Sequence, residues 1–498
     1  MLHFGKARAA GNTSRGLFLT TALISGMIAF PGHAADVTWG NAADGNYSDT
    51  VNWLLGGLPL GALPDGTDTV IFTGKPSSTV TIDVDPANMT NLTVAEIGSI
   101  ADGTIAFASG TASTLTYSDV HDNALAGDLT LDLNGADLNI VATTNLNFAG
   151  DIVNGGASAA TLDINTTATM NLSGDITGDT SVTLSAGDLT LAGTNTYTGA
   201  TTVTTGTLQV TGGAAIADAG AVVVNGGTFA LLAHETIGTL EGAGGVNVNA
   251  NTLTVAGTGD KTFSGALSGS GVLSKTNTGT LTLGTGNAGY TGGFAISNAG
   301  VIEGGADAFG NGTGDIALTN GTLNVTATSA LAHDITVGVG GGTLATDDGV
   351  TATLTGAITA TGGGLTFGNG TDTSEFALNN TAASSADSAA TIAGSTTVVL
   401  GNGNSAGLFT NGLALSGTLD LNGNDTATGN LSGAGTVTNN AATGTAVLTV
   451  GGDGTASGSF TGTITDGTTA TTGLALNKGL ATDEFSLTTS QTYTGGTT

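Results

Sequence analysis

The sequence is poor in several residue types on which ordinary globular domains depend. It contains no Cys, 5 Pro in 498 residues, 4% aromatic residues and 9% charged residues. The absence of Cys excludes disulfides and thiolate metal sites. Yet 39% of the residues are hydrophobic, in short runs of Val, Ile and Leu that suffice to bury a long, thin core. The chain is therefore expected to fold.

Basic residues are the scarcest charged type, and three of the seven lie at the start of the chain. They precede an apolar stretch, residues 17–30, which is followed by small residues. This order is that of a secretory signal peptide, and the apolar stretch is shorter than the ~20 residues that span a bilayer. We predict a signal peptide at residues 1–34, export to the periplasm and then outside, and a mature chain that begins at Ala35.

Beyond this segment the charge is almost entirely negative. Four Lys, no Arg and all 38 Asp and Glu remain, which gives a net charge of −34. Such a chain has no cationic patch to neutralise phosphates or anionic lipid headgroups. We therefore expect no nucleic-acid partner.

Glycine is abundant, with 85 residues, and one phrase recurs. Leu-Thr-Leu leads to Tyr-Thr-Gly around Tyr197 and Tyr290, and the last twelve residues, LTTSQTYTGGTT, contain the same phrase. Upstream of the second and third occurrences, LEGAGGV (240–246) matches LSGAGTV (431–437), and FSGAL (263–267) matches FTGTI (460–464). Ordered matches at nearly constant offsets indicate an internal duplication.

Within each copy, four to six residues with alternating Leu, Val or Ile are followed by turns rich in Gly, Asn, Asp and Ser, which predicts strands. Asn-Gly in LDLNGAD (131–137) and LDLNGND (419–425) suits either a hairpin or the corner of a coil. Uniform repetition without linkers favours the coil. We predict an all-β fold, a right-handed parallel β-helix (solenoid) with one turn per ~20–25 residues.

The segment 38–72 differs in composition, because it contains both Trp, Trp39 and Trp53, and two of the five Pro. It is expected to form an N-terminal cap over an otherwise unpaired strand edge; the alternative is a platform on which Trp stacks against sugars. The predicted domains are residues 35–95 for the cap and first turns and residues 96–498 for the β-helix. Within the latter, repeats lie near 181–210, 263–304 and, truncated, 474–498.

The run from 263 to 304 resembles the passenger-associated transport repeat of bacterial autotransporters. The matching positions are Lys275, Gly279, Leu281, Leu283, Tyr290, Thr291, Gly292 and Gly293. The first copy departs from the motif, because it has Ala200 where the motif has Gly and lacks the Lys. The resemblance implies a β-helical passenger on the surface of a Gram-negative bacterium, or released from it, exported through an outer-membrane β-barrel at its own C-terminus. The sequence ends without such a barrel, so we expect the reading frame to continue.

The sequence offers weak candidates for catalysis. Asp347 and Asp348 form an adjacent acidic pair of the kind that pectinases use, but an acidic turn before Gly349 is the simpler interpretation. Ser405 lies in a Gly-x-Ser-x-Gly pattern that chance alone explains in a chain so rich in Gly.

Metal-binding candidates are equally sparse. His121, His234 and His333 are scattered and do not form a zinc-site pattern. Acidic turns such as Asp132 to Asp137 offer at most a weak Ca²⁺ site. We predict no catalytic residue, cofactor or metal.

Two function classes therefore remain. The first is a non-enzymatic stalk in adhesion or autoaggregation, whose partners would be a host surface, the extracellular matrix or another copy of itself. The alternative is a carbohydrate-active, pectinase-like enzyme on a β-helix. The stalk is favoured because it needs only a repetitive surface, whereas the enzyme needs converging acids and bases.

Overall fold

The structure is a computed structural model. It describes residues 129–305, 307–451, 458–479 and 484–498, together with short stretches before them: 36–39, 45–46, 53–55, 58–59, 69–72, 75–81, 91–94, 97–101, 103–107, 112–117 and 124–125. The predicted signal peptide and His121 lie outside the described residues.

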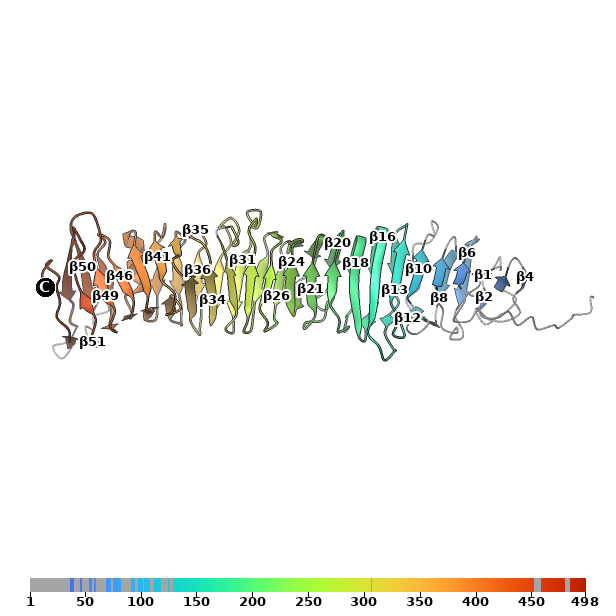
Figure 1. Cartoon of the computed structure of the whole chain (residues 1–498), viewed down its shortest axis with the longest axis horizontal. Coiled ribbons are helices and arrows are strands. Elements are labelled where there is room, and N and C mark those ends of the chain that lie inside the picture. The colour runs from blue at the N-terminus through green and yellow to red at the C-terminus, as the bar shows by residue number, and fades with distance from the viewer. Residues whose placement is uncertain are drawn as a thin grey trace, which may run out of the picture.

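The chain winds into a rod whose strands stack along the long axis (Figure 1). Almost every strand pairs in parallel with a strand one turn earlier and one turn later, so the coil has three faces that the chain visits in order. From residue 69 onward, paired residues lie between 17 positions apart, as for Thr228 and Gly245, and 27 positions apart, as for Gly458 and Phe485. The prediction of an all-β parallel solenoid is confirmed; its right-handed sense stays a prediction.

The first face is a parallel sheet along the rod, and its last two strands join it through an isolated bridge between Gly433 and Phe460. Its strands are β1 (Asp36–Trp39), β5 (Thr69–Phe72), β7 (Asn91–Val94), β10 (Ser113–Tyr117), β13 (Leu138–Ala142), β19 (Thr201–Val203), β21 (Ala221–Val224), β24 (Thr239–Gly242), β27 (Lys261–Phe263), β30 (Thr280–Leu283), β32 (Val301–Gly304), β34 (Gly321–Val325), β37 (Gly342–Thr346), β40 (Leu365–Phe367), β43 (Ala390–Ile392), β45 (Leu413–Leu415), β48 (Leu431–Ser432), β51 (Gly458–Phe460) and β54 (Phe485–Leu487). Two long strands, β16 (Ala160–Leu172) and β18 (Thr180–Leu191), contribute their first halves to this face and their second halves to the next.

The second face follows the first in every turn. Its strands are β2 (Gly45–Asn46), β6 (Lys75–Thr81), β8 (Ile97–Ala101), β11 (Ala124–Leu125), β14 (Leu146–Phe148), β20 (Thr207–Val210), β22 (Thr228–Leu231), β25 (Gly245–Asn247), β28 (Ala266–Ser268), β35 (Ser329–Leu331), β38 (Thr351–Leu354), β41 (Ser374–Leu378), β44 (Thr396–Leu400), β46 (Thr418–Asp420), β49 (Thr436–Thr438) and β52 (Thr463–Ile464).

The third face completes the turn. Its strands are β9 (Gly103–Ala106), β12 (Leu129–Asp132), β15 (Ile152–Val153), β17 (Ile176–Thr177), β23 (Glu235–Ile237), β26 (Thr252–Val255), β29 (Val272–Lys275), β31 (Gly293–Ser297), β33 (Ile316–Thr319), β36 (Ile335–Val337), β39 (Ile358–Ala360), β42 (Ser385–Ala386), β47 (Thr426–Thr428), β50 (Thr445–Val450) and β53 (Thr471–Leu476). A 3₁₀ helix, η2 (Gly403–Leu408), takes the place of one strand between β42 and β47.

The core is a set of apolar ladders inside the coil. Strand residues alternate between buried and partly exposed, as in β10 and β13, because side chains on a strand point to opposite faces. Leu115, Ile140, Ile164 and Leu184 are successive register partners on the first face, and each is at most 1% exposed. Burying such a side chain contributes about 1.5–3 kcal/mol, so stacked turns stabilise one another.

The Asn-Gly pairs form corners of the coil and not hairpins. Asn134 and Gly135 both have positive φ, 49° and 76°, in the corner between β12 and β13. These two strands lie on different faces and each pairs with strands of adjacent turns. Asn422 and Gly423 form a corner of the same backbone kind between β46 on the second face and β47 on the third, with φ of 43° and 81°. Asn and Gly tolerate this left-handed backbone, which turns the chain sharply.

Antiparallel pairing among the described strands is confined to the N-terminal end. β1 pairs in parallel with β5 and antiparallel with β3 (Trp53–Leu55), which pairs antiparallel with β4 (Leu58–Pro59). The hairpin thus covers the strand edge that the first turn would otherwise leave unpaired. It lies within the predicted cap, whose boundaries stay a prediction; the Trp side chains are outside the described part.

Candidate functional site

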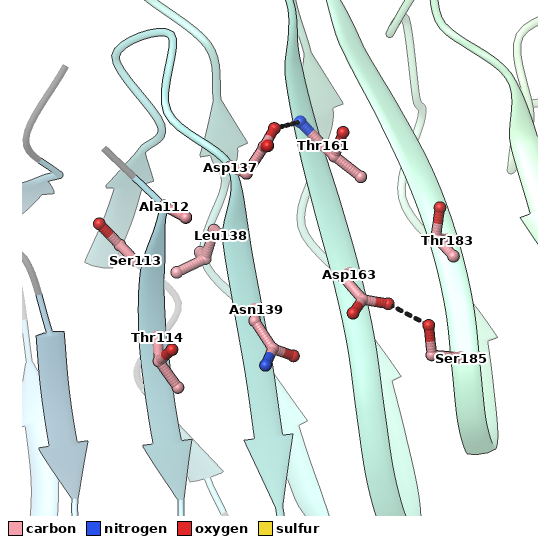
Figure 2. A pocket seen from close by; sticks show the side chains of 10 residues that line it. All are labelled: Ala112, Ser113, Thr114, Asp137, Leu138, Asn139, Thr161, Asp163, Thr183 and Ser185. Carbon is pink, nitrogen blue, oxygen red and sulfur yellow. Dashed lines mark hydrogen bonds between the residues drawn. The ribbon is translucent and has the colours of Figure 1, made fainter. Parts of the chain in front are cut away.

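A polar groove crosses four neighbouring strands of the first face, β10, β13, β16 and β18 (Figure 2). Its volume is about 490 Å³. The groove is lined by Ala112, Ser113, Thr114, Asp137, Leu138, Asn139, Thr161, Asp163, Thr183 and Ser185. The lining residues therefore come from four successive turns of the coil, in or beside strands whose paired residues at the groove lie 20 to 25 positions apart in sequence.

Register alignment places one outward polar side chain per strand along the groove. Thr114 is opposite Asn139, Asn139 is opposite Asp163, and Asp163 is opposite Thr183. Neighbouring parallel strands lie 4.7–4.9 Å apart, so these four side chains form a row of roughly 15 Å along the rod. The row follows from the alternation of strand residues, since every second residue must face outward.

Two carboxylates of the groove are held by neighbouring turns. The Thr161 amide donates to Oδ1 of Asp137 at 2.8 Å, and the Ser185 hydroxyl donates to Oδ1 of Asp163 at 2.6 Å (Figure 2). Among the described residues, neither Oδ2 has a recorded hydrogen-bond partner. Each carboxylate is thus fixed through one oxygen and presents the other as an acceptor.

Asn139 adds an unsatisfied group between these carboxylates. Its Oδ1 is buried and has no hydrogen-bond partner in the described part of the chain. The residues that line the groove include two Asp and no Lys, Arg or His. The groove therefore favours ligands that donate hydrogen bonds and disfavours anions.

The two carboxylates of the acidic pair have hydrogen-bond partners on or beside different strands. Oδ1 of Asp347 accepts from the Asn324 side chain at 2.9 Å, whereas Oδ1 of Asp348 accepts from the amide and hydroxyl of Thr373. These hydrogen bonds, the hydroxyl first, lower the pKa of exposed Asp348. The two carboxylates hold different strands, and Gly349 follows with φ of 72°, as expected for an acidic turn.

The hydroxyl of Ser405 is buried and engaged within the protein. The residue lies in η2, is completely buried, and donates its hydroxyl to Oδ1 of Asn380 at 2.6 Å. The sequence indicated no helix here, but a single 3₁₀ segment forms around the Ser. A nucleophile elbow would expose this hydroxyl instead.

The remaining titratable candidates lie apart. His234 is exposed and accepts from the Thr252 amide at 2.8 Å, whereas His333 is 3% exposed and packs edge-on against Phe294. Oδ1 of Asp132 accepts from the amides of Asn134 and Gly155 in a corner. Among the described residues, no three His, Asp or Glu gather into a metal site.

The Tyr of the second repeat holds two neighbouring turns together. Tyr290 is 1% exposed; its hydroxyl accepts from the Leu273 amide at 3.0 Å and lies 2.9 and 2.7 Å from the carbonyls of Gly271 and Gly293. Burial raises the pKa of this hydroxyl, which therefore stays protonated. Nearby, Oδ1 of buried Asn287 accepts from the Leu267 amide of the preceding turn at 2.7 Å.

Lys275 has an equally local role. Its ammonium group donates to the carbonyls of Gly257, Thr276 and Asn277 at 2.8–2.9 Å and to that of Thr278 at 3.3 Å, and the residue is 1% exposed. Burial lowers its pKa. The Lys of the motif thus links the corner after β29 to the preceding turn, and its ammonium group is not available to a ligand.

Glu235 is a further buried acid that sequence inspection missed. It is 2% exposed at an inward position of β23, where Oε1 accepts from the Ile216 amide at 3.2 Å. Its Oε2 is buried and has no hydrogen-bond partner among the residues that the structure describes. Burial, which outweighs its backbone hydrogen bonds, raises its pKa to about 7. The ionised form of this carboxyl group destabilises the folded protein, because a charge is buried away from water.

Sequence inspection also missed the groove, although it named Asp137 as part of an acidic turn. Asn139, Asp163 and Ser185 are polar residues in separate strands, and no local motif joins them. Their shared signal is their recurrence at an outward position once per turn. Only the register shows that these positions are neighbours.

Comparison with known proteins agrees with two of the three predicted repeats. The model of the passenger-associated transport repeat matches residues 184–210 and 273–303. The parallel solenoid and these repeats fit an autotransporter passenger. The third predicted repeat, near 474–498, stays a prediction.

A curated relative gives a more particular likeness. Over 226 residues the chain is 30% identical to the Adhesin BmaC autotransporter of Brucella suis biovar 1 (strain 1330). The match covers 43% of this chain and 6% of that protein, so the chain spans a small fraction of the relative's length. No solved structure matches the chain significantly.

Proposed function

We propose that this chain is an adhesin-like passenger, a non-enzymatic stalk displayed on or released from a Gram-negative cell surface. The observation that carries the proposal is the passenger-associated transport repeat within a parallel solenoid, together with the similarity to an autotransporter adhesin. Among the described residues, no helix is long and apolar enough to cross a membrane. A signal peptide at residues 1–34 would supply the export signal.

The rod supports the stalk role because it is long, uniform and acidic. Repulsion between acidic rods opposes indiscriminate association, so adhesion needs a defined surface. The arrangement of acids favours this role over a pectinase-like enzyme, since Asp347 and Asp348 are each engaged with a different strand. Host surface, matrix and self-association are the candidate partners.

The test is display of the complete protein, encoded by its own gene, on a non-adherent bacterial host. Adherence to epithelial cells and to matrix-coated plates, and settling of the culture, should rise relative to a host with an empty vector. Pectin and ester hydrolysis should not. Surface display without any gain in adherence or settling would contradict the proposal, and so would hydrolysis that is lost in an Asp347→Asn or Ser405→Ala variant.

A further inference from the structure

We propose that the polar groove over β10, β13, β16 and β18 binds a neutral oligosaccharide laid along the axis of the rod. The inference rests on the proposed adhesin role, because it names the ligand class that this role would use. Nothing in the repeat motif assigns a ligand to these strands.

The spacing of the groove matches a ligand that offers hydroxyl groups at regular intervals. Thr114, Asn139, Asp163 and Thr183 succeed one another at one residue per strand, in steps of about 4.8 Å. An extended oligosaccharide presents a ring and its hydroxyls at a similar interval. A globular or branched ligand would contact fewer of these positions.

The chemistry of the lining matches the same ligand. Asp137 and Asp163 each use one oxygen within the protein and leave the other to accept. Hydroxyl groups donate readily to carboxylate and amide oxygens. Because Thr161 and Ser185 already hold the carboxylates in place, a ligand need not order them on binding.

Charge excludes the other large classes of polymer. No basic side chain lines the groove, and the whole chain has a net charge of −31, so sulfated or uronic polysaccharides and nucleic acids would be repelled. The lining is more polar than apolar, and the Leu in it, Leu138, is buried within its strand. A peptide strand cannot add to this sheet, because both edges of β13 and β16 are already paired.

A basic peptide is the strongest competing ligand, since two carboxylates would attract it. Such attraction, however, would act along the whole acidic rod and would weaken with salt. Binding of a neutral sugar would depend on the groove alone and hardly on salt. The two possibilities therefore separate experimentally.

The experiment measures binding of hexasaccharides to the purified full chain by titration calorimetry. The neutral probes are cellohexaose, maltohexaose and chitohexaose; a heparin hexasaccharide and hexalysine serve as the anionic and cationic probes. We expect at least one neutral probe to bind equally at low and high salt. Asp163→Ala and, independently, Thr183→Val should each weaken it, the former about tenfold, as the loss of one charged hydrogen bond implies.

Glu303 provides a matched control on the same face. Its carboxylate accepts from the Thr282 hydroxyl at 2.7 Å, as Asp163 accepts from Ser185, but it lies outside the groove. Glu303→Ala should leave binding unchanged. Hydrogen exchange over β13 and β18 checks that each variant keeps its fold.

Three outcomes would overturn the inference: no neutral probe binds, neutral binding persists in folded Asp163→Ala, or only heparin or hexalysine binds. The adhesion assay on displayed protein is scored separately. Adherence without sugar binding would refute the groove's role and leave the adhesin function standing. Sugar binding without adherence would refute the adhesin function and leave the binding role of the groove standing.

Discussion

The two copies of the duplicated unit, residues 240–293 and 431–496, can be compared strand by strand. Leu240 and Leu431 lie on the first face, Val246 and Val437 on the second, and the pattern continues through β27 and β51. At the Tyr-Thr-Gly turn, Asn287 accepts from the Leu267 amide, and Gln491 accepts from the equivalent Ile464 amide at 2.5 Å. The amide side chain and the apolar ladder are thus common to both copies.

The copies differ in their buried charges. Glu235, just before the first copy, corresponds to Thr426, and Lys275 corresponds to Leu476, because each faces the equivalent residue of the neighbouring turn. The only nearby Lys in the second copy, Lys478, is exposed. Both copies thus keep the apolar ladders and the side-chain amide that bonds to the preceding turn. Buried charged residues occur in one copy, so the coil does not require them.

The largest effect should come from a glycine that both copies share. A Cβ on Gly265 would lie 1.7 Å from the Gly244 carbonyl oxygen, and one on Gly462 would lie 2.0 Å from that of Gly435. The backbone can relieve this clash only if the two turns move apart. Gly265→Ala should therefore lower the local free energy of unfolding by about 3 kcal/mol or more. Hydrogen exchange of β25 and β28 measures the effect.

Gly259 is the matched control for this substitution. It is exposed, and a Cβ there would meet no atom within 4 Å. Gly259→Ala should change local stability by less than about 0.5 kcal/mol. Equal exchange rates in the two variants would show that close packing at Gly265 is unimportant.

The second prediction exchanges the buried acid between copies. The pKa of Glu235 is raised from 4.5 to about 7, so the folded state binds the proton more tightly than the unfolded state. Its favourable contribution is complete below pH 4.5, is lost as the pH rises through 7, and stays lost above that. Glu235→Thr should therefore stabilise β23 by about 2–3 kcal/mol at pH 8 relative to pH 4.

The reverse exchange, Thr426→Glu, sharpens this test. It should introduce the same loss of stability between pH 4.5 and 7 around β47, because Thr426, which is 4% exposed, also lies at an inward position. Local stability is measured by hydrogen exchange across this pH range, and each variant is compared with wild type at the same pH. The comparison removes the contribution of the carboxylates that both proteins share. If the stability difference between Glu235→Thr and wild type did not change with pH, the raised pKa of Glu235 would be refuted.

The third prediction removes the buried Lys. Lys275→Met keeps the aliphatic stem but leaves four carbonyls without their donor, which should cost about 2 kcal/mol in the corner after β29. Lys478→Met removes an exposed charge in the other copy and should have no measurable effect. Limited proteolysis at 276–279 reports on the corner, and resistance equal to wild type would contradict its role.

The smallest expected difference concerns the Tyr hydroxyl. Tyr290→Phe leaves the buried Leu273 amide unpaired and should cost about 1–2 kcal/mol. Tyr493→Phe removes one bond to Thr497, 2.5 Å long, near the chain end, and should cost less than about 0.5 kcal/mol. Hydrogen exchange of β29 and β53 compares them; equal losses would mean that burial does not distinguish the copies.

The fold was largely predictable because its causes are local and repeated. Alternation in segments such as STLTY and LNIVA sets which side chains face inward, and Asn-Gly pairs such as Asn134 and Gly135 supply the left-handed corners. Repetition at nearly constant length then favours stacking of like turns. From these features the parallel solenoid follows without knowledge of any distant contact.

The tertiary structure alone decided what depends on register. The sequence indicated an acidic turn at 132–137 but not that Asp137 would border a groove with Asp163, because turns vary from 17 to 27 residues and a slip of one residue reverses inward and outward positions. The same variation hid Glu235, whose burial follows from its pairing with Leu253. The sequence by itself thus determined the coil, while the stacking of particular turns determined which polar residues share a surface and which lie inside.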